Sequence, residues 1–347
     1  MIGKNIFRIF VILLLVLSAA VISYKPKDQK KDGLNKYSET KLLMDTVVRI
    51  DICATEKDSV SAAKAFQVAW KTMEDDVDML SVFDENSDIS KLNNAKTKPV
   101  EVHKKVYNLV AKARYFSDIS DGAFDVTVEP LMQLWRDAKK TNKLPAPRAV
   151  RKVLNAMGEG QIELLGNNRM RLKNSLTKLD LSGIAKGFVV DEAAQVLRAN
   201  GFSDFLIVAG GDMYAGGTNI EGRPWQVGVR DPRDKNKVIG IVSLSNKGVT
   251  TSGGYERFFE IQGKKYSHIM NPKTGFPAEE ALSSTVIANT TEDADALSTA
   301  LCVLGTQKGT ELINSLGGDY ASLIVTPDGQ SVVQTASKEY KNFQVKE

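Results

Sequence analysis

The sequence is poor in cysteine and in histidine. It has two of each among its 347 residues, Cys53 and Cys302, and His103 and His268. Two cysteines exclude a disulfide-stapled scaffold, and they cannot build a metal cluster on their own. Both lie in apolar runs, so we expect them to be buried free thiols. Any chemistry at a histidine falls to one of two positions.

Strong net charge and the glycine patterns of nucleotide-binding loops are also absent. The 46 Lys and Arg residues against 42 Asp and Glu residues leave a net charge of +4. This excess is too small and too dispersed to indicate a nucleic-acid partner, and we expect none. The segment SGIAKG at residues 182–187 carries neither the Rossmann nor the P-loop glycine pattern.

One hydrophobic run stands near the N-terminus. Residues 11–22 are apolar and follow Lys4 and Arg8, which is the layout of a signal peptide and short for a full membrane span. We expect residues 1–24 to be a signal peptide or an N-terminal membrane anchor. A buried core helix is the alternative. Residues 25–37 are basic and polar and should form a linker, which leaves residues 38–347 as one folded domain.

The N-terminal run also predicts a location. No cysteine follows it closely, so lipid attachment is not expected. The domain should be exported to the outer face of the cytoplasmic membrane, either membrane-anchored or secreted.

Hydrophobic periodicity outlines the domain without regular alternation of strand and helix. Apolar residues at helical spacing mark helices over 62–80 and 106–116. The polar, proline-containing residues 136–150 predict an exposed excursion. Irregular order of this kind favours an α+β fold over a doubly wound sheet. Strands are expected at 48–52, 205–209, 225–229, 239–244, 257–261 and 321–326.

The stretch 177–201 predicts a strand, a tight turn and a helix. We expect a strand over 177–181, a helix after Ser182, and Gly201 as its C-terminal glycine. A helix N-terminus offers free N–H groups to an anion, and Lys186 in its first turn adds a positive charge. An ordinary helix start with an incidental lysine is the alternative.

A second helix start predicts a cation site. Asp295 and Thr299 are four residues apart in DADALSTA, residues 293–300, so their oxygens share one helix face. A carboxylate and a hydroxyl are hard ligands that suit Mg²⁺. By itself the segment equally fits an N-cap aspartate with an unrelated threonine.

Two longer motifs make the chain recognisable. DLSGIAKGFVVD at residues 180–191 and HIMNPKTGFP at 268–277 resemble, almost residue for residue, motifs of the FAD:protein FMN transferase (ApbE) family. Shorter likenesses lie at 122–127, 208–212 and 249–259, and the likenesses of the loops at 83 and 208 are the weaker ones. The resemblance covers about residues 40–335. It implies a single large α+β domain with T-fold-like antiparallel sheets and packed helices.

The resemblance also implies a reaction. It is the Mg²⁺-dependent transfer of FMN from FAD to a Ser or Thr hydroxyl of an acceptor protein, with release of AMP. The acceptor would be a membrane or extracytoplasmic redox protein with an FMN-binding-type Ser/Thr motif. An FAD pyrophosphatase that gives FMN and AMP, and a non-catalytic FAD-binding protein, are the alternatives.

The family's roles fall on matching positions of this chain. His268 and Lys186 would be catalytic, His268 assisting deprotonation of the acceptor hydroxyl with a pKa near its ordinary value, ~6.5. Phe83 stands where the family usually has tyrosine, which keeps stacking and loses a hydroxyl. The metal ligands would be Gly183, Asp295, Ser298 and Thr299, and FAD would be held by Met44, Phe83, Ala123, Phe124, Asp125, Asp180, Lys186 and Ile269.

Overall fold

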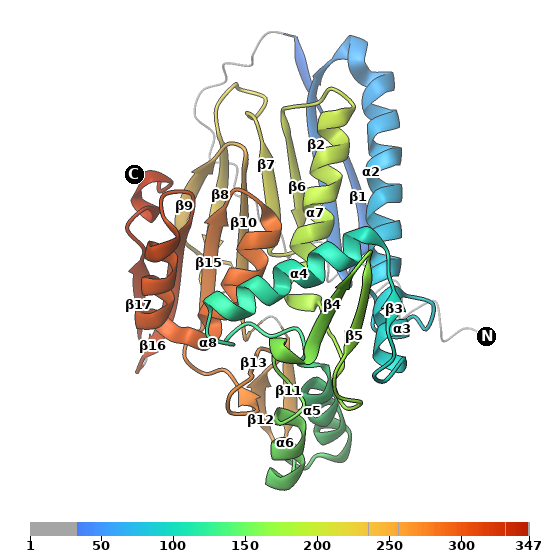
Figure 1. The fold of residues 1–347 in the computed structure, drawn as a ribbon. Coiled ribbons are helices and arrows are strands. Elements are labelled where there is room, and N and C mark those ends of the chain that lie inside the picture. The colour runs from blue at the N-terminus through green and yellow to red at the C-terminus, as the bar shows by residue number, and fades with distance from the viewer. Residues whose placement is uncertain (1–32, 235, 256, 330, 346–347) are drawn as a thin grey trace, which may run out of the picture.

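An eight-stranded sheet forms the centre of the molecule. The computed structural model describes residues 33–234, 236–255, 257–329 and 331–345. Every neighbouring pair in the sheet is antiparallel (Figure 1). The predicted α+β fold with antiparallel sheets and packed helices is therefore confirmed. In spatial order the strands are β1 (Leu34–Leu43), β2 (Thr46–Thr55), β6 (Phe205–Ala209), β7 (Asp212–Gly216), β10 (Lys247–Gly253), β15 (Ser283–Ala288), β16 (Ala321–Asp328) and β17 (Ser331–Ala336).

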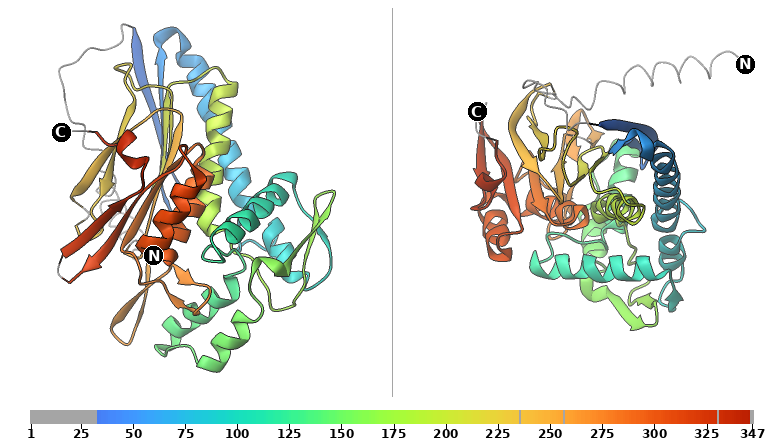
Figure 2. Two further views of the ribbon diagram at one scale, coloured as in Figure 1. Left: turned by 60° about the vertical axis from the view of Figure 1, so that its left-hand side comes forward. Right: turned by 90° about the horizontal axis from the view of Figure 1, so that it is seen from above.

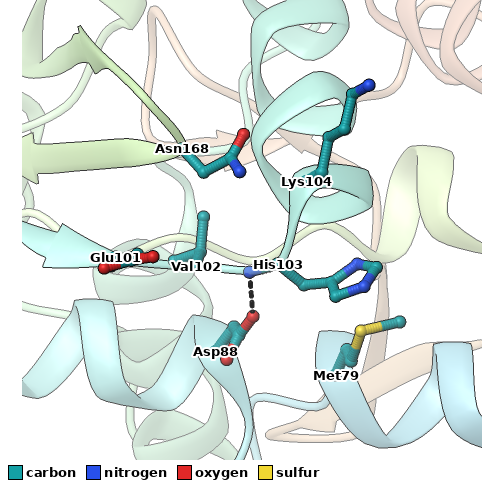
Figure 3. Close-up of a pocket in the computed structure, with 7 residues that line it drawn as sticks. All are labelled: Met79, Asp88, Glu101, Val102, His103, Lys104 and Asn168. Atoms are coloured by element: carbon teal, nitrogen blue, oxygen red, sulfur yellow. Dashed lines mark hydrogen bonds between the residues drawn. The ribbon is translucent and has the colours of Figure 1, made fainter.

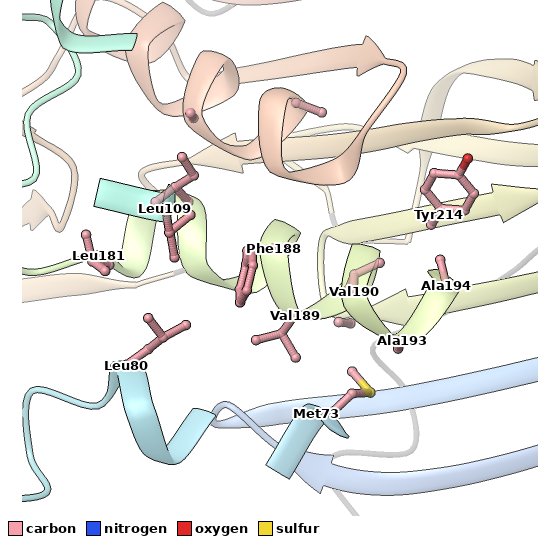
Figure 4. Packing of buried hydrophobic residues seen from close by; sticks show 14 of the residues in the cluster. Met73, Leu80, Leu109, Leu181, Phe188, Val189, Val190, Ala193, Ala194 and Tyr214 are labelled. Atoms are coloured by element: carbon pink, nitrogen blue, oxygen red, sulfur yellow. The ribbon is translucent and has the colours of Figure 1, made fainter. Parts of the chain in front are cut away.

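Three long helices cover one face of this sheet, namely α2 (Ser59–Leu80), α7 (Ser182–Ala199) and α8 (Thr291–Leu316) (Figure 2). Figure 4 shows α7 between Met73 and Leu80 of α2 and Tyr214 of β7. The helical geometry of α8 is broken at Gly305, where φ is +71°. The predicted helix over 62–80 is thus confirmed by α2.

The opposite face is covered by the hairpin β8 (Trp225–Arg230) and β9 (Val238–Leu244). Leu206 and Val208 of β6 pack with this hairpin, whereas Ile207 faces the helices. Because successive side chains point to opposite faces, a strand covered on both sides must be apolar throughout. All five residues of β6 are accordingly buried.

The remaining elements flank the sheet at one end. α4 (Lys104–Ile119) crosses beside α7 and α8 and confirms the predicted helix over 106–116. A three-stranded sheet and α3 lie beside it. Their bounds are α3 (Asp88–Asn94), β3 (Val100–Glu101), β4 (Ile162–Gly166) and β5 (Arg169–Leu172), and short 3-10 turns lie at Glu56–Asp58, Glu159–Gln161 and Tyr340–Asn342.

A small lobe projects from the same end (Figure 1). We use "lobe" for α5 (Glu129–Thr141), α6 (Pro147–Leu154) and the hairpin β11 (Phe258–Ile261) and β12 (Lys264–Ser267). It has its own apolar core of Leu131, Trp135, Ala138, Phe259, Ile261 and Met270. The two-residue strands β13 (Met270–Asn271) and β14 (Phe276–Pro277) follow the hairpin.

The excursion predicted for residues 136–150 is exposed over most of its length, as expected, but it is not free of secondary structure. Most of its residues belong to α5 and α6, and Trp135 and Ala138 anchor α5 in the lobe's core. The strand predicted over residues 177–181 is wrong, because these residues form only one isolated bridge, between Lys178 and Val128. A side chain replaces the neighbouring strand here: Leu179 N–H donates to Asn93 Oδ1 at 2.6 Å, and Asn93 Nδ2 donates to Leu179 O at 2.9 Å.

At the start of the described chain, the central sheet includes part of the predicted linker. β1 begins at Leu34, which pairs with Thr55, so residues 34–37 of the predicted linker belong to the sheet. The predicted signal or anchor segment, residues 1–24, lies outside the described residues. Among the residues that are described, we find no helix with the length and apolar character needed to cross a membrane.

Candidate active site

The first turn of α7 brings its small residues against α8 and the 123–127 loop. An added Cβ on Gly183 would lie 3.2 Å from the Phe124 ring and 3.4 Å from Thr299 Oγ1. An added Cβ on Gly187 would lie 2.4 Å from the Thr291 carbonyl oxygen. A side chain at position 187 would therefore push α7 and α8 apart, whereas one at position 183 would press on the Phe124 ring.

Two buried carboxylates share one ammonium where α7 meets α8 and β7. Lys186 Nζ is paired with Asp212, which is fully buried, and Asp295 Oδ2 accepts from Gly187 N–H at 3.0 Å. Burial opposes the charge on Lys186, but the carboxylates of Asp212 and Asp295 outweigh it and raise the lysine's pKa. Burial, and then the charge of Asp212, raise the pKa of Asp295.

This cluster carries more negative than positive charge. Asp212 Oδ1 is buried and has no hydrogen-bond partner. Since an unpaired buried carboxylate oxygen is costly, the arrangement favours a further cation nearby. The donor chemistry fits Mg²⁺, because the ligands that approach each other are carboxylate and hydroxyl oxygens.

Three hydroxyl groups continue the polar surface along α8 and β10. Ser298 is fully buried, and its Oγ lies 2.7 Å from Ser252 Oγ and donates to Asp295 O at 3.0 Å. Thr299 Oγ1, which is partly exposed, lies 3.4 Å from Ser252 Oγ. Thr299 is therefore the more accessible of the two predicted α8 hydroxyls, and Ser298 braces the helix against β10.

His268 is held by the backbone of Arg257. Its Nδ1 lies 2.9 Å from Arg257 O. A carbonyl can only accept, so Nδ1 carries the proton and Nε2 keeps its lone pair. Burial, assisted by the charges of Arg257 and Lys186, lowers the pKa of His268 to about 4. The expected value near 6.5 was therefore wrong, and the imidazole is neutral at physiological pH.

Asp180 lies beside the first turn of α7. Its Oδ1 accepts from Ser182 N–H at 2.8 Å, and its own N–H donates to Val126 O at 2.8 Å. Asp180 thus joins the 123–127 loop to the helix start, and one of its carboxylate oxygens is already used there.

The predicted flavin-binding residues fall into an inner and an outer group. Ala123 and Ile269 are buried in one small cluster, so the 123–127 and 268–277 loops meet there. The Lys273–Asp121 ion pair joins the same two loops. The Phe124 ring is buried against Phe116, so its side chain belongs to the core.

Asp125 and Met44 occupy turns at the edge of the cluster. Asp125 accepts from Thr127 N–H and Oγ1, and burial raises its pKa. Met44 lies in the β1–β2 turn at φ +54°, and its neighbour Asp45 lies 4.0 Å from Arg257. Phe83 is the outlier, because its side chain is 82% exposed on the loop after α2.

Four further residues of this region did not stand out in the sequence. Asp212 and Ser252 lie in two of the shorter likenesses to the family, 208–212 and 249–259. Arg257 holds His268 through its backbone oxygen. Asp191, the last residue of DLSGIAKGFVVD, accepts from Thr291 N–H at 2.9 Å and Glu292 N–H at 2.8 Å. The motif could have indicated Asp191, but not which helix it contacts.

The other histidine has a structural role. His103 caps α4 through Nδ1, which accepts from Lys105 N–H at 3.3 Å. The backbone N–H of His103 donates to Asp88 Oδ2 at 2.6 Å (Figure 3). His103 lines a surface hollow of about 620 Å³ that contains none of the predicted site residues. His268 therefore remains as the histidine available for catalysis.

The sequence of the chain is similar to a known family and to its named members. The ApbE family profile matches residues 44–324. The FAD:protein FMN transferase of Haemophilus influenzae is 34% identical over 280 residues, which cover 77% of this chain and 80% of the relative. The Treponema pallidum protein of the same name is 31% identical over 312 residues, covering 85% and 86%.

Solved structures give the same result. The ApbE protein of Thermotoga maritima superposes with a TM-score of 0.81 at 31% identity and covers 90% of this chain and 100% of its own. The flavin transferase ApbE of Vibrio cholerae gives 0.79 at 26% identity, covering 89% and 99%. The fold, the matched motifs and the clustered site residues lead to one conclusion: this chain belongs to the ApbE family.

Proposed function

We propose that this flavin transferase moves FMN from FAD to a Ser or Thr hydroxyl of an acceptor protein and releases AMP. The acceptor oxygen attacks the phosphorus of the FMN half, and an O–P bond forms as the bond to the AMP phosphate breaks. The hydroxyl proton goes to the enzyme, and AMP leaves with the electron pair. The acceptor would be a membrane or extracytoplasmic redox protein.

The observation that carries this proposal is the charge imbalance at the α7–α8 junction. Two buried carboxylates face one ammonium beside the accessible hydroxyl of Thr299. Asp295, Thr299 and the Gly183 carbonyl would hold Mg²⁺, with Ser298 bracing them. When bound, Mg²⁺ would neutralise the pyrophosphate and polarise its P–O bonds.

The protein's own residues would do the rest. Lys186, held by Asp212, supplies a fixed positive charge near the pyrophosphate. His268 presents an unprotonated Nε2 because its Nδ1–H is held by Arg257 O, so it can take the acceptor's proton. Met44, Ala123, Asp125, Asp180 and Ile269 would position the FAD, with Phe83 free to stack on an exposed ring.

The test uses membranes from cells in which the gene has been deleted, since these contain unmodified acceptors. Full-length protein is added with FAD and Mg²⁺, and proteins are separated under denaturing conditions. A fluorescent band with covalent flavin, and one AMP per flavin bound, is expected. Free FMN and AMP without a band would mean a pyrophosphatase, and bound but unchanged FAD would mean a carrier.

We also propose that the enzyme acts on the outer face of the cytoplasmic membrane. The support is the apolar run 11–22 after Lys4 and Arg8, which has the layout of an export signal or anchor. Export would place the transferase beside extracytoplasmic redox acceptors.

A further inference from the structure

The lobe beside the site has a larger net positive charge than the chain as a whole. Residues 129–154 and 258–267 contain nine Lys and Arg residues against three Asp and Glu residues, a net charge of +6. The whole chain carries only +4, so all other residues together carry −2. The positive charge is therefore concentrated in one small part of the fold.

Most of this charge is not neutralised. In α5, Arg136 is paired with Glu129, and Lys140 lies 3.4 Å from Asp137. Lys264 lies 3.8 Å from Glu279. Five further cations have exposed side chains and no ion pair with any described residue, and three of them share one face of α6 at i, i+3 and i+4 spacing. They are Lys139, Lys143, Arg148, Arg151 and Lys152.

The lobe is fixed to the loop that carries His268. Trp135 Nε1 donates to Gly275 O at 3.1 Å, and an added Cβ on Gly275 would lie 2.3 Å from Val150. Met270, two residues after His268, is buried in the lobe's core. The cationic surface is therefore held next to the candidate base by packed contacts.

We propose that this lobe is the docking surface for the acceptor protein, and that it binds an acidic face beside the acceptor's Ser or Thr. The inference rests on the proposed function, which requires a macromolecule to deliver a hydroxyl to His268. Long-range attraction between opposite charges speeds such an encounter and orients it. Phe276, 43% exposed and packed on Trp135, adds an aromatic contact at the border of lobe and site.

Anionic lipid headgroups are the competing partner for a basic surface. The position of the lobe favours the acceptor, because a partner bound there lies against the loop that must receive the hydroxyl. A membrane bound at the lobe would instead block the path by which an acceptor reaches His268.

The experiment compares two variants of equal charge. The lobe variant changes Lys139, Lys143, Arg148, Arg151 and Lys152 to Gln. The control variant changes five exposed lysines outside the lobe that have no ion pair with a described residue, namely Lys57, Lys64, Lys98, Lys338 and Lys341, to Gln. The full-length proteins are compared for kcat/KM toward the acceptor that the wild type labels in the membrane test, and for KM toward FAD.

We expect the lobe variant to lose on the order of 10-fold in kcat/KM for the acceptor at low salt. Its KM for FAD and its thermal midpoint should stay unchanged, and the control should change less than 2-fold. At high salt the kcat/KM values of the wild type and the lobe variant for the acceptor should converge. A deca-glutamate peptide should inhibit the wild type by raising KM for the acceptor.

Three results would overturn the proposal. Equal acceptor kcat/KM in the two variants would remove the lobe from docking. Loss of binding to phosphatidylglycerol vesicles in the lobe variant, with unchanged kcat/KM for transfer to the labelled acceptor, would assign the surface to lipid. Absence of any transfer by the wild type would refute the proposed function, and the docking surface with it.

Discussion

A substitution at Asp295 tests metal binding in a protein that we expect to remain folded. It is buried and bonded to one backbone N–H, and its charge adds to that of Asp212 beside a single lysine. Replacement by alanine removes a proposed ligand and also relieves repulsion, so we expect Asp295→Ala to stay folded. Transfer should fall at least 100-fold at ordinary Mg²⁺ concentrations.

Titration of activity with Mg²⁺ checks this prediction. Loss of a residue that only supports a metal ligand costs about 10–100-fold in metal affinity, so loss of a direct ligand should cost at least that. Asp293→Asn is the matched control, because Asp293 lies on the same helix but pairs with Lys112 and Tyr320. Wild-type rates in Asp295→Ala would refute the metal assignment.

The lowered pKa of His268 predicts how the transfer rate depends on pH. Because its pKa is lowered to about 4, the neutral base is already populated above that pH. The wild-type rate should therefore show no His268 limb between pH 5.5 and 7.5, and should rise with pH only through about 4. His268→Gln should lose roughly 10²–10⁴-fold in rate and keep its affinity for FAD.

The same shift has a consequence for stability. An unfolded histidine takes up a proton near its ordinary pKa of ~6.5, while the folded one stays neutral down to about 4, so stability falls as pH drops from 6.5 to 4. His268→Gln should flatten this slope, and His103→Gln should not. Equal losses of FAD affinity and rate, with the pH profile unchanged, would instead assign His268 to bracing the 268–277 turn.

At the scale of elements, α7 and α8 are joined by reciprocal hydrogen bonds. Asp191 of α7 accepts from the first N–H groups of α8, and Asp295 of α8 accepts from Gly187 of α7. Burial raises the pKa of the Asp191 carboxyl to about 7 against these hydrogen bonds. The pairing fixes Asp295 and Thr299 relative to Gly183.

Asp191→Ala should therefore impair both folding and transfer. It leaves two buried N–H groups without an acceptor, and we expect a loss of about 2–4 kcal/mol in the free energy of unfolding. Transfer should drop more than 10-fold even where the protein remains folded. Denaturant unfolding and transfer assays check the two effects.

Thr290→Ala is the comparison for Asp191→Ala. Thr290 caps the N-terminus of α8, where its side chain accepts from Asp293 N–H at 3.2 Å. This bond does not link α8 to α7. The substitution should cost about 1 kcal/mol and leave the rate unchanged. Equal effects of the two substitutions on transfer would contradict a positioning role for Asp191.

Elements were predictable where the pattern is local. The helices α2, α4 and α8 bury stripes of apolar residues that recur at helical spacing, so the sequence alone places them. Residues 177–181 were mispredicted because the partner of Leu179 is the Asn93 side chain, 86 positions away. The helix α5 was missed because Trp135 packs on Phe259 and Tyr266, far along the chain.

The site was predictable only through its motifs. Gly183, Lys186, His268 and Asp295 lie in segments whose residue order is distinctive. The Lys186–Asp212 pair joins α7 to β7, and no local pattern reports such a contact. The low pKa of His268 depends on burial and on Arg257 and Lys186, which the sequence cannot bring together.

The candidate site and the start of the described chain lie at opposite ends of β1. The Met44 end of β1 is beside Arg257, whereas Leu34 pairs with Thr55 at the other end of the strand. A membrane segment at residues 1–24 would therefore be joined to the fold at the end of β1 away from the site. This geometry would leave the site and the basic lobe open to an acceptor.

The last prediction is that the protein is exported without lipid attachment. The run 11–22 follows Lys4 and Arg8, and positive charge on this side keeps the extreme N-terminus in the cytoplasm. The two cysteines cannot serve as acyl sites near the membrane, because Cys53 and Cys302 are buried inside the fold. In spheroplasts, external protease should therefore reach the folded domain, while a cytoplasmic marker stays intact. Growth with a labelled fatty acid should leave this protein unlabelled, with a lipoprotein of the same cells as positive control. Label on the chain, or full-length protein confined to the cytosol, would contradict the prediction.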